Sequence, residues 1–275
     1  MAKAKTAFVC NDCGADFPKW QGQCGECQAW NTLSEIRLSA PAAKAANARV
    51  AGRSGYAGTV AAVQRLEDVA VVDLPRLASG FDELDRVLGG GFVPGSSILI
   101  GGHPGAGKST LLLQALCQLA AAHPALYVTG EESPEQIALR ANRLGLPTDQ
   151  LQLMAETDVD AILASAESLK PKILVVDSIQ VVHSETLTSA PGSVSQVRDC
   201  AAQLTRYAKQ TGTILILVGH VTKDGSLAGP KVLEHMIDCS ILLEGDHDSR
   251  YRTLRGQKNR FGAVNELGIF AMTDA

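Results

Sequence analysis

The sequence predicts an α/β fold in which a mostly parallel, twisted β-sheet is flanked by helices and preceded by a small cysteine-bearing module. Strand-like and helix-like segments alternate through most of the chain, and the strand-like segments are aliphatic runs without polar alternation. Such runs are typical of strands covered on both faces, and βα alternation is typical of parallel sheets. With 275 residues, of which 45% are hydrophobic, the chain is long enough for one large domain and a small module.

The expected elements follow one another from residue 81 onward. A helix ended by a glycine turn is expected at residues 81–88. Strands are expected at residues 97–101, 125–129, 151–154, 172–177 and 213–218, and helices at residues 111–116, 134–144, 159–169 and 194–210. Three further strands, at residues 239–243, 251–254 and 267–270, are expected to extend the sheet in the antiparallel sense.

Residues 102–109 have the G-x-x-x-x-G-K-S form of a phosphate-binding loop, and they stand between an expected strand and an expected helix. Their glycines permit a tight turn whose backbone N–H groups face an anion at the helix N-terminus. Lys108 is expected to reach the β- and γ-phosphates of a nucleoside triphosphate, and the Ser109 hydroxyl to bind Mg2+. A chance glycine-rich turn is the alternative, which the flanking strand and helix disfavour. The expected nucleotide-binding residues are Gly102, His103, Pro104, Gly105, Ala106, Gly107, Lys108, Ser109 and Thr110.

Two Cys-x-x-Cys pairs near the N-terminus predict a zinc site. Cys10 and Cys13 are separated from Cys24 and Cys27 by ten residues. Each pair places two thiolates on a tight turn, and four thiolates close a tetrahedral site that leaves no position for a catalytic water. Residues 8–30 offer almost no core, so we expect this segment to depend on the metal for folding. Disulfides are the alternative, which a cytoplasmic location would disfavour.

Composition changes along the chain predict three parts. Residues 1–37 form the zinc module, residues 38–59 are a flexible linker rich in Ala, Gly and Ser, and residues 60–275 form the main domain. The formal net charge of −4 excludes a protein that is basic all over, so nucleic-acid contacts require local basic patches. The N-terminus lacks the apolar core of a signal peptide, and there is no apolar run of membrane-spanning length. We expect a cytoplasmic protein without a membrane partner.

Three acidic residues follow expected strands, where ligands of parallel sheets gather. Asp177 ends an aliphatic run and has the position of a Walker B aspartate, which would hold Mg2+ alongside Ser109. Glu131 and Glu132 follow the strand at residues 125–129 and are candidates for orienting or deprotonating the attacking water. In an extended chain only one of them would point to the site, although a bend would change this. The alternatives are a turn-forming role for Asp177 and a favourable helix N-terminal location for the glutamates.

Polar and basic residues suggest a sensor and DNA contacts. His220 follows the strand at residues 213–218, where a γ-phosphate sensor is expected, although a structural role is an equal alternative. Residues 185–195 and 221–231 form small, polar loops on the same edge, suited to backbone contacts with DNA. Residues 250–260 contain five basic residues and no acid, a pattern suited to phosphates. The expected DNA-binding residues are Lys223, Lys231, Arg250, Arg252 and Arg255.

Several motifs together resemble a known family. Residues 76–96, which include the Leu-Gly-Gly-Gly run at 88–91, are similar to the segment that leads into the ATPase core of RecA-like proteins. The KNRFG sequence at residues 258–262, residues 227–235, the four cysteines and the phosphate loop complete the pattern. The chain resembles the bacterial RadA (Sms) family of DNA repair proteins over essentially its whole length.

This resemblance implies a RecA-like P-loop NTPase core that hydrolyses ATP. It further implies a hexameric ring on single-stranded DNA that promotes branch migration of recombination intermediates together with the RecA recombinase. Glu131 is then preferred over Glu132 as the residue acting on water, and Lys258 and Arg260 would act in trans at the ATP of a neighbouring subunit. The family also carries a C-terminal domain resembling the Lon protease, which these 275 residues lack.

Two alternatives share the same core. A nucleotide-dependent assembly or signalling ATPase would hexamerise without moving along DNA, and its zinc module would dock a protein. A replicative helicase would separate strands without a recombinase. Single-stranded DNA affinity that falls steeply with salt distinguishes the DNA motor from the assembly ATPase.

Overall fold

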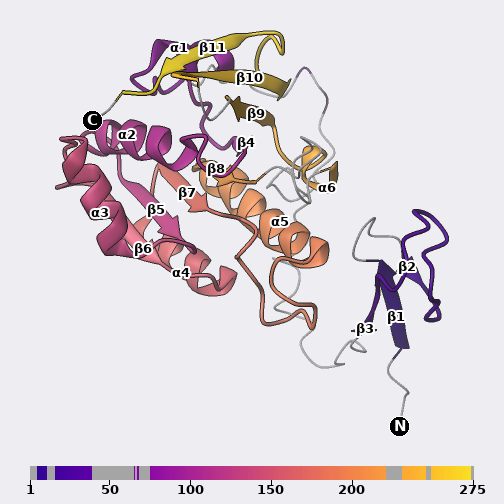
Figure 1. Ribbon diagram of the computed structural model, residues 1–275. Coiled ribbons are helices and arrows are strands. Elements are labelled where there is room, and N and C mark those ends of the chain that lie inside the picture. The colour runs from indigo at the N-terminus through magenta and orange to yellow at the C-terminus, as the bar shows by residue number, and fades with distance from the viewer. Residues whose placement is uncertain are drawn as a thin grey trace.

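The computed structural model describes residues 5–10, 16–38, 65, 67, 75–220, 231–245 and 249–273. Near the N-terminus, β1 (Lys5–Cys10), β2 (Asp16–Phe17) and β3 (Leu33–Leu38) form an antiparallel sheet in the order β2-β1-β3 (Figure 1). Apart from residue 38, the expected linker lies outside the described residues.

The large domain contains an eight-stranded sheet in the order β11-β10-β9-β4-β8-β7-β5-β6. Its strands are β4 (Ser97–Gly102), β5 (Ala125–Thr129), β6 (Gln152–Ala155), β7 (Ile173–Asp177), β8 (Ile214–Val218), β9 (Cys239–Glu244), β10 (Tyr251–Asn259) and β11 (Leu267–Ala271). All neighbours from β9 to β6 pair in parallel, whereas β10 and β11 pair in the antiparallel sense. The predicted mostly parallel α/β sheet is therefore confirmed.

Helices cover both faces of this sheet (Figure 1). They are α1 (Asp82–Leu88), α2 (Lys108–Ala120), α3 (Pro134–Arg143), α4 (Val159–Leu169), α5 (Val194–Thr211) and the short α6 (Lys231–Glu234). One core cluster joins α1, α2 and α3 to one face, and a second joins α4 and α5 to the other. Successive strand residues alternate between the clusters, with Tyr127 and Val175 in the first and Leu126 and Leu174 in the second. Among the described residues, no helix has both the length and the apolar character that a membrane span needs.

Local signals set the helix boundaries. Ser133 caps α3 through a capping box with Gln136, and Pro134 occupies the first turn, where it needs no N–H partner. Gly89 ends α1 with a φ of 83°, a left-handed conformation that glycine adopts without steric cost. Asp158 caps α4 by accepting backbone N–H groups of its first turn.

The direction of β9 differs from the expectation. β9 was expected to be antiparallel, but it pairs with β4 in parallel, from Ile98 opposite Cys239 to Gly102 opposite Leu243. The connection from β8 returns to the amino end of the sheet and includes α6, so β9 starts from the same end as β4. A hydrophobic run does not show in which direction a strand runs. A parallel neighbour needs a long crossover connection, whereas a short hairpin gives an antiparallel one.

A buried carboxylate fixes the amino end of β4. Asp238 is 1% exposed, and its Oδ2 accepts hydrogen bonds from the backbone N–H and the hydroxyl of Ser97, both at 3.1 Å. Lys209 on α5 donates to the same oxygen at 2.9 Å, and Arg260 donates to Oδ1 at 3.0 Å. Burial opposes ionisation, but the hydrogen bonds from Lys209 and Ser97 outweigh it and lower the pKa of Asp238.

Replacing this carboxylate should give a pH-dependent loss of stability. Because the folded-state pKa of Asp238 is below its ordinary value of 3.8, ionisation stabilises the fold above that pH, and the contribution disappears as the pH falls through the folded-state pKa. Asp238→Asn is expected to cost about 1–3 kcal/mol at pH 7 in urea unfolding. The exposed Asp149→Asn is the control and should cost little. A deficit for Asp238→Asn that is equally large at pH 7 and pH 3 would contradict the ionic role.

The close packing of β4 against β9 gives a second prediction. A Cβ at Gly102 would lie 2.4 Å from the carbonyl oxygen of Leu243, whereas a Cβ at Gly145 would meet nothing within 4 Å. Both glycines have positive φ, so an alanine at either position carries a conformational cost of about 1–2 kcal/mol. Gly102→Ala is expected to lose about 1–3 kcal/mol more than Gly145→Ala in urea unfolding, because only the former overpacks the sheet. Equal losses would show that the contact relaxes freely.

Candidate nucleotide-binding site

The glycine loop after β4 has the predicted geometry. Gly102, Gly105 and Gly107 have φ values of 156°, 79° and 101°, and α2 begins at Lys108. These conformations turn the chain sharply between strand and helix, so the loop leaves the first N–H groups of α2 directed at the space above the sheet.

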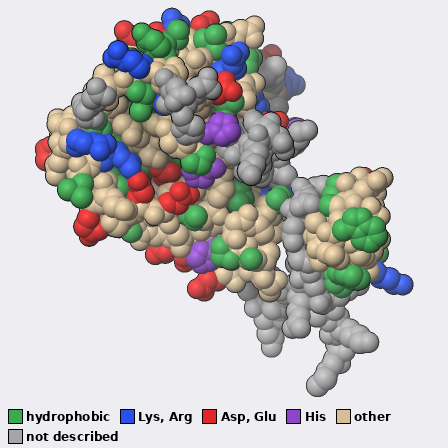
Figure 2. Space-filling model, viewed as in Figure 1, with side chains coloured by type: hydrophobic (Ala, Val, Ile, Leu, Met, Phe, Trp, Pro, Cys, Tyr) green, Lys and Arg blue, Asp and Glu red, His purple; other side chains and the backbone are tan. Residues whose placement is uncertain are grey.

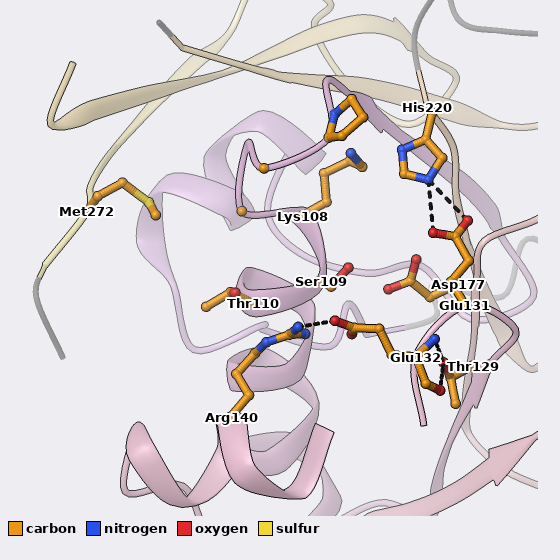
Figure 3. A pocket seen from close by; sticks show the side chains of 13 residues that line it. Lys108, Ser109, Thr110, Thr129, Glu131, Glu132, Arg140, Asp177, His220 and Met272 are labelled. Carbon is orange, nitrogen blue, oxygen red and sulfur yellow. Dashed lines mark hydrogen bonds and ion pairs between the residues drawn. The ribbon is translucent and has the colours of Figure 1, made fainter. Parts of the chain in front are cut away.

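A cavity of about 370 Å3 lies next to this loop (Figure 3). Its lining consists of Pro104, Gly105, Gly107, Lys108, Ser109, Thr110, Thr129, Glu131, Glu132, Arg140, Asp177, His220 and Met272. Of the other expected loop residues, Gly102 and Ala106 are buried beside the cavity, and His103 is exposed. The cavity therefore brings most of the predicted loop together with the residues expected to act on water, metal and the γ-phosphate.

Lys108 is a buried cation without an anionic hydrogen-bond partner among the described residues. It is 4% exposed, and its Nζ donates to the carbonyl oxygens of Gly102 at 2.8 Å and His103 at 2.9 Å. Burial lowers its pKa, while the charges of Asp177 and Glu131 oppose this shift. An incoming phosphate would supply the missing negative charge.

Asp177 and Ser109 face each other across the cavity (Figure 3). Asp177 ends β7 and is 8% exposed, and its Oδ2 accepts a hydrogen bond of 2.5 Å from the Tyr127 hydroxyl. A hydroxyl and a carboxylate are hard oxygen donors of the kind that Mg2+ prefers. The residues present thus fit the expected magnesium site.

Both adjacent glutamates line the cavity, because the chain bends directly after β5. Thr129 makes this bend: its hydroxyl donates to the carbonyl oxygen of Glu132 at 2.8 Å and accepts from the N–H of Glu132 at 3.1 Å. The alternation of an extended chain therefore does not apply. Glu132 forms an ion pair with Arg140 of α3, and this hydrogen bond raises the pKa of Arg140.

Glu131 has different partners. Its Oε1 accepts a hydrogen bond from the hydroxyl of Ser178 and lies 3.2 Å from Nε2 of His220, whose distance to Oε2 is 3.4 Å. His220 lies two residues after β8, so Glu131 connects the cavity to the start of the predicted DNA loop. Lys223, within that loop, lies outside the described residues, as does the side chain of Lys231.

The basic residues in β10 and directly before it differ in exposure. Arg250 and Arg255 are exposed, and Arg255 lies 3.6 Å from the carboxylate of Glu244. Arg252 is 8% exposed and donates to the carbonyl oxygens of Ser249 at 2.6 Å and Tyr251 at 3.1 Å. Strand alternation turns Arg252 toward the covered face, so its burial does not favour the predicted DNA contact, which stays a prediction. Basic and acidic side chains are interspersed on the visible surface (Figure 2).

Lys258 and Arg260 lie at the opposite end of the sheet from the cavity. Lys258 lies opposite Ser240 near the amino end of β9 and donates to the carbonyl oxygens of Glu234 and Ile237. Burial and the neighbouring Arg260 lower the pKa of Lys258. Neither side chain lines the cavity of its own chain.

Three of the four predicted zinc ligands form a cluster. The Sγ atoms of Cys10, Cys24 and Cys27 lie within 4.8 Å of one another, and Cys13 lies outside the described residues. Cys10 and Cys27 are 3.6 Å apart, well beyond the length of a disulfide, about 2.05 Å. Trp20 and Trp30 are 57% and 69% exposed, so the large aromatic side chains do not build a core here. This arrangement suits a metal-centred module.

Several site residues were not identified from the sequence: Thr129, Arg140, Ser178, Met272 and Tyr127. Arg140 reaches the cavity from the second turn of α3, and Met272 arrives from the C-terminal hairpin, so neither is signalled by local sequence. Tyr127 had a usable signal, because residues 127 and 177 point to the same face when β5 and β7 pair in parallel.

Comparison with known families defines the class of protein. Residues 61–226 match the AAA domain, and residues 8–35 match the rubredoxin metal binding domain. The first match covers more than half of the chain, which therefore belongs to the AAA domain family of nucleotide-binding ATPases. The second match, with the cysteine cluster, supports a zinc ribbon at the N-terminus.

The particular relatives are bacterial DNA repair proteins. The chain is 64% identical over 275 residues to DNA repair protein RadA of Escherichia coli (strain K12), covering 100% of this chain and 60% of the relative. It is 66% identical over 276 residues to DNA repair protein RadA of Haemophilus influenzae and 46% identical over 279 residues to that of Bacillus subtilis (strain 168), covering 100% of this chain and 59% of each relative. The resemblance to bacterial RadA proteins is thus confirmed, over about three fifths of their length.

Metal removal should affect the small module selectively. The chain has two tryptophans, Trp20 and Trp30, and both lie in the predicted zinc module. Chelation of zinc is expected to abolish the near-ultraviolet circular dichroism of the tryptophans, because the module has little core of its own. The far-ultraviolet melting transition of the large domain should change little, and Cys24→Ser should reproduce the effect. Retention of the tryptophan signal after complete zinc removal would contradict a metal-dependent fold.

Proposed function

We propose that this protein is an ATP-dependent DNA motor of recombinational repair, which binds single-stranded DNA and promotes branch migration of recombination intermediates together with a RecA recombinase. The contact between Glu131 and His220 carries the proposal. It joins the residue proposed to act on water to the start of the loop proposed to hold DNA. The relatives named as DNA repair proteins support the biological role.

In this proposal, residues 1–37 form the zinc module, residues 38–59 link it to the rest, and residues 60–275 form the ATPase domain. Six subunits form a ring around single-stranded DNA in the cytoplasm. Lys258 and Arg260 act at a neighbouring subunit's ATP, and their distance from their own cavity supports this role. In their own chain, Lys258 donates to the carbonyl oxygen of Ile237 and Arg260 pairs with Asp238, which holds both side chains in defined positions.

The cavity residues have complementary roles in ATP hydrolysis. Lys108 and the first N–H groups of α2 bind the phosphates, and Ser109 and Asp177 would hold Mg2+, which would neutralise charge on the β- and γ-phosphates. Glu131 orients a water molecule and accepts its proton as the water oxygen attacks the γ-phosphorus and the bond to the bridging oxygen breaks. Glu132, paired with Arg140, helps to shape the cavity wall.

Coupling to DNA follows from the position of His220. Glu131 has one carboxylate to share among Ser178, His220 and the water. When Glu131 turns toward the water, its bond to His220 weakens, and His220 is released from the cavity wall. Lys223, Lys231, Arg250 and Arg255 supply positive charge for the DNA backbone without reading bases.

An assembly or signalling ATPase that does not move along DNA is the second candidate. The exposed Trp20 and Trp30 favour it, since exposed aromatic side chains are frequent at protein interfaces. Figure 2 shows hydrophobic side chains on the surface of this small module.

The decisive measurement is ATP turnover with and without single-stranded DNA. DNA is expected to stimulate the wild-type protein, and Lys108→Ala should abolish tight nucleotide binding. Glu131→Gln should reduce turnover by about a hundredfold or more while preserving nucleotide binding, because it removes the proton acceptor. Glu132→Gln, which disturbs the pair with Arg140, should lose less.

Subunit mixing tests the action in trans. Glu131→Gln and Lys258→Ala chains should each be inactive alone, yet a mixed ring contains interfaces with an intact Glu131 facing an intact Lys258. Partial recovery of turnover is expected on mixing. Equal turnover with and without DNA, together with no salt-sensitive affinity for it, would contradict the motor and favour the assembly ATPase.

A further inference from the structure

A buried tyrosine lies directly beneath the proposed magnesium site. Tyr127 is 1% exposed, in the middle of β5, and its hydroxyl donates to Oδ2 of Asp177 at 2.5 Å. Tyr127 lies opposite Val175, and Thr129 lies opposite Asp177, so Tyr127 and Asp177 point to the same face of the sheet, two residues apart. This is the face that α2 covers.

The Tyr127 hydroxyl is also influenced by Ser109, the second residue proposed to hold Mg2+. Burial raises the pKa of Tyr127 and Asp177 raises it further, whereas Ser109, the second residue of α2, acts on this pKa in the opposite direction. The phenol is therefore bonded to the carboxylate proposed to hold Mg2+ and is close enough to the Ser109 hydroxyl to be influenced by it. Tyr127 does not line the cavity, so it has no direct contact to offer a nucleotide.

We propose that Tyr127 is a positioning residue that holds the carboxylate of Asp177 in the orientation that binds the magnesium ion of the nucleotide. The tyrosine occupies Oδ2 and leaves Oδ1 for the metal or its water. A hydrogen bond to a charged acceptor in a buried setting is among the stronger ones, and it restricts rotation of the carboxylate. The inference rests on the nucleotide site of the proposed function.

The chain offers a matched control. Tyr207 is 6% exposed, and its hydroxyl donates at 2.9 Å to the backbone carbonyl of Ala166, in the cluster on the other face of the sheet. Tyr207→Phe and Tyr127→Phe each remove one phenolic hydrogen bond from a buried ring. Only the latter removes it from a proposed metal ligand.

The experiment is a Mg2+ titration of nucleotide binding on the full chain, followed by the fluorescence of a labelled ATP analogue. Tyr127→Phe is expected to raise the Mg2+ concentration at half-saturation by roughly three- to tenfold. Tyr207→Phe should leave it at the wild-type value. With EDTA present, all three proteins should bind the analogue equally weakly, because Tyr127 acts only through the metal. In an Asp177→Asn background, Tyr127→Phe should cause no further shift.

Other results would overturn either the role of Tyr127 or the nucleotide site as a whole. A Mg2+ midpoint for Tyr127→Phe equal to that of Tyr207→Phe would overturn the inference. The inference would also be overturned if Tyr127→Phe unfolded at a temperature at which Tyr207→Phe stays folded, because the Tyr127 hydroxyl would then stabilise the fold itself. Failure of the wild-type protein to bind the analogue at any Mg2+ concentration would refute the nucleotide site, and with it the proposed function. Wild-type binding without a shift in the variant would refute only the role of Tyr127.

Discussion

The candidate site depends on the parallel register of four neighbouring strands. The phosphate loop, His220, Asp177 and Glu131 lie at the carboxyl ends of β4, β8, β7 and β5, which are neighbours in the sheet and run in the same direction. Backbone hydrogen bonds continue the ladder past the strand ends: Gly130 donates to Asp177 at 2.8 Å, and Gly219 donates to Ile100 at 2.8 Å. A slip of one residue would turn a functional side chain to the other face, so the chemistry requires this register.

The two ends of the sheet have distinct roles. The carboxyl end gathers Lys108, Asp177 and Glu131 around a cavity, and within the described part of the chain the lysine hydrogen-bonds only to backbone carbonyl oxygens. The amino end pairs the carboxylate of Asp238 with Lys209 and Arg260, in an ion cluster satisfied within one chain. One end is therefore arranged to receive a charged ligand, and the other to stabilise the fold and hold the KNRFG segment.

Much of the fold and part of the site could be predicted from sequence, for physical reasons that differ by element. Continuous aliphatic runs revealed the parallel core, and the glycine loop has a geometry that few other sequences support. The direction of β9 was missed because it depends on a long connection, and the burial of Arg252 was missed because charge alone suggested exposure. Met272 reaches the cavity only through tertiary folding, which leaves no local trace.

The burial of α2 has one further consequence. This helix is covered along nearly its whole length, from Leu111 to Ala120, so a shift of its axis would require the first core cluster to repack. Lys108 and Ser109 thus belong to a helix that is fixed relative to the sheet. In the proposed function, a change of nucleotide would be accommodated most readily by the strand-end side chains Glu131 and His220, which are partly open to solvent. The proposed phosphate-binding residues therefore stand on a rigid helix, whereas the proposed sensor stands where side chains have room to move.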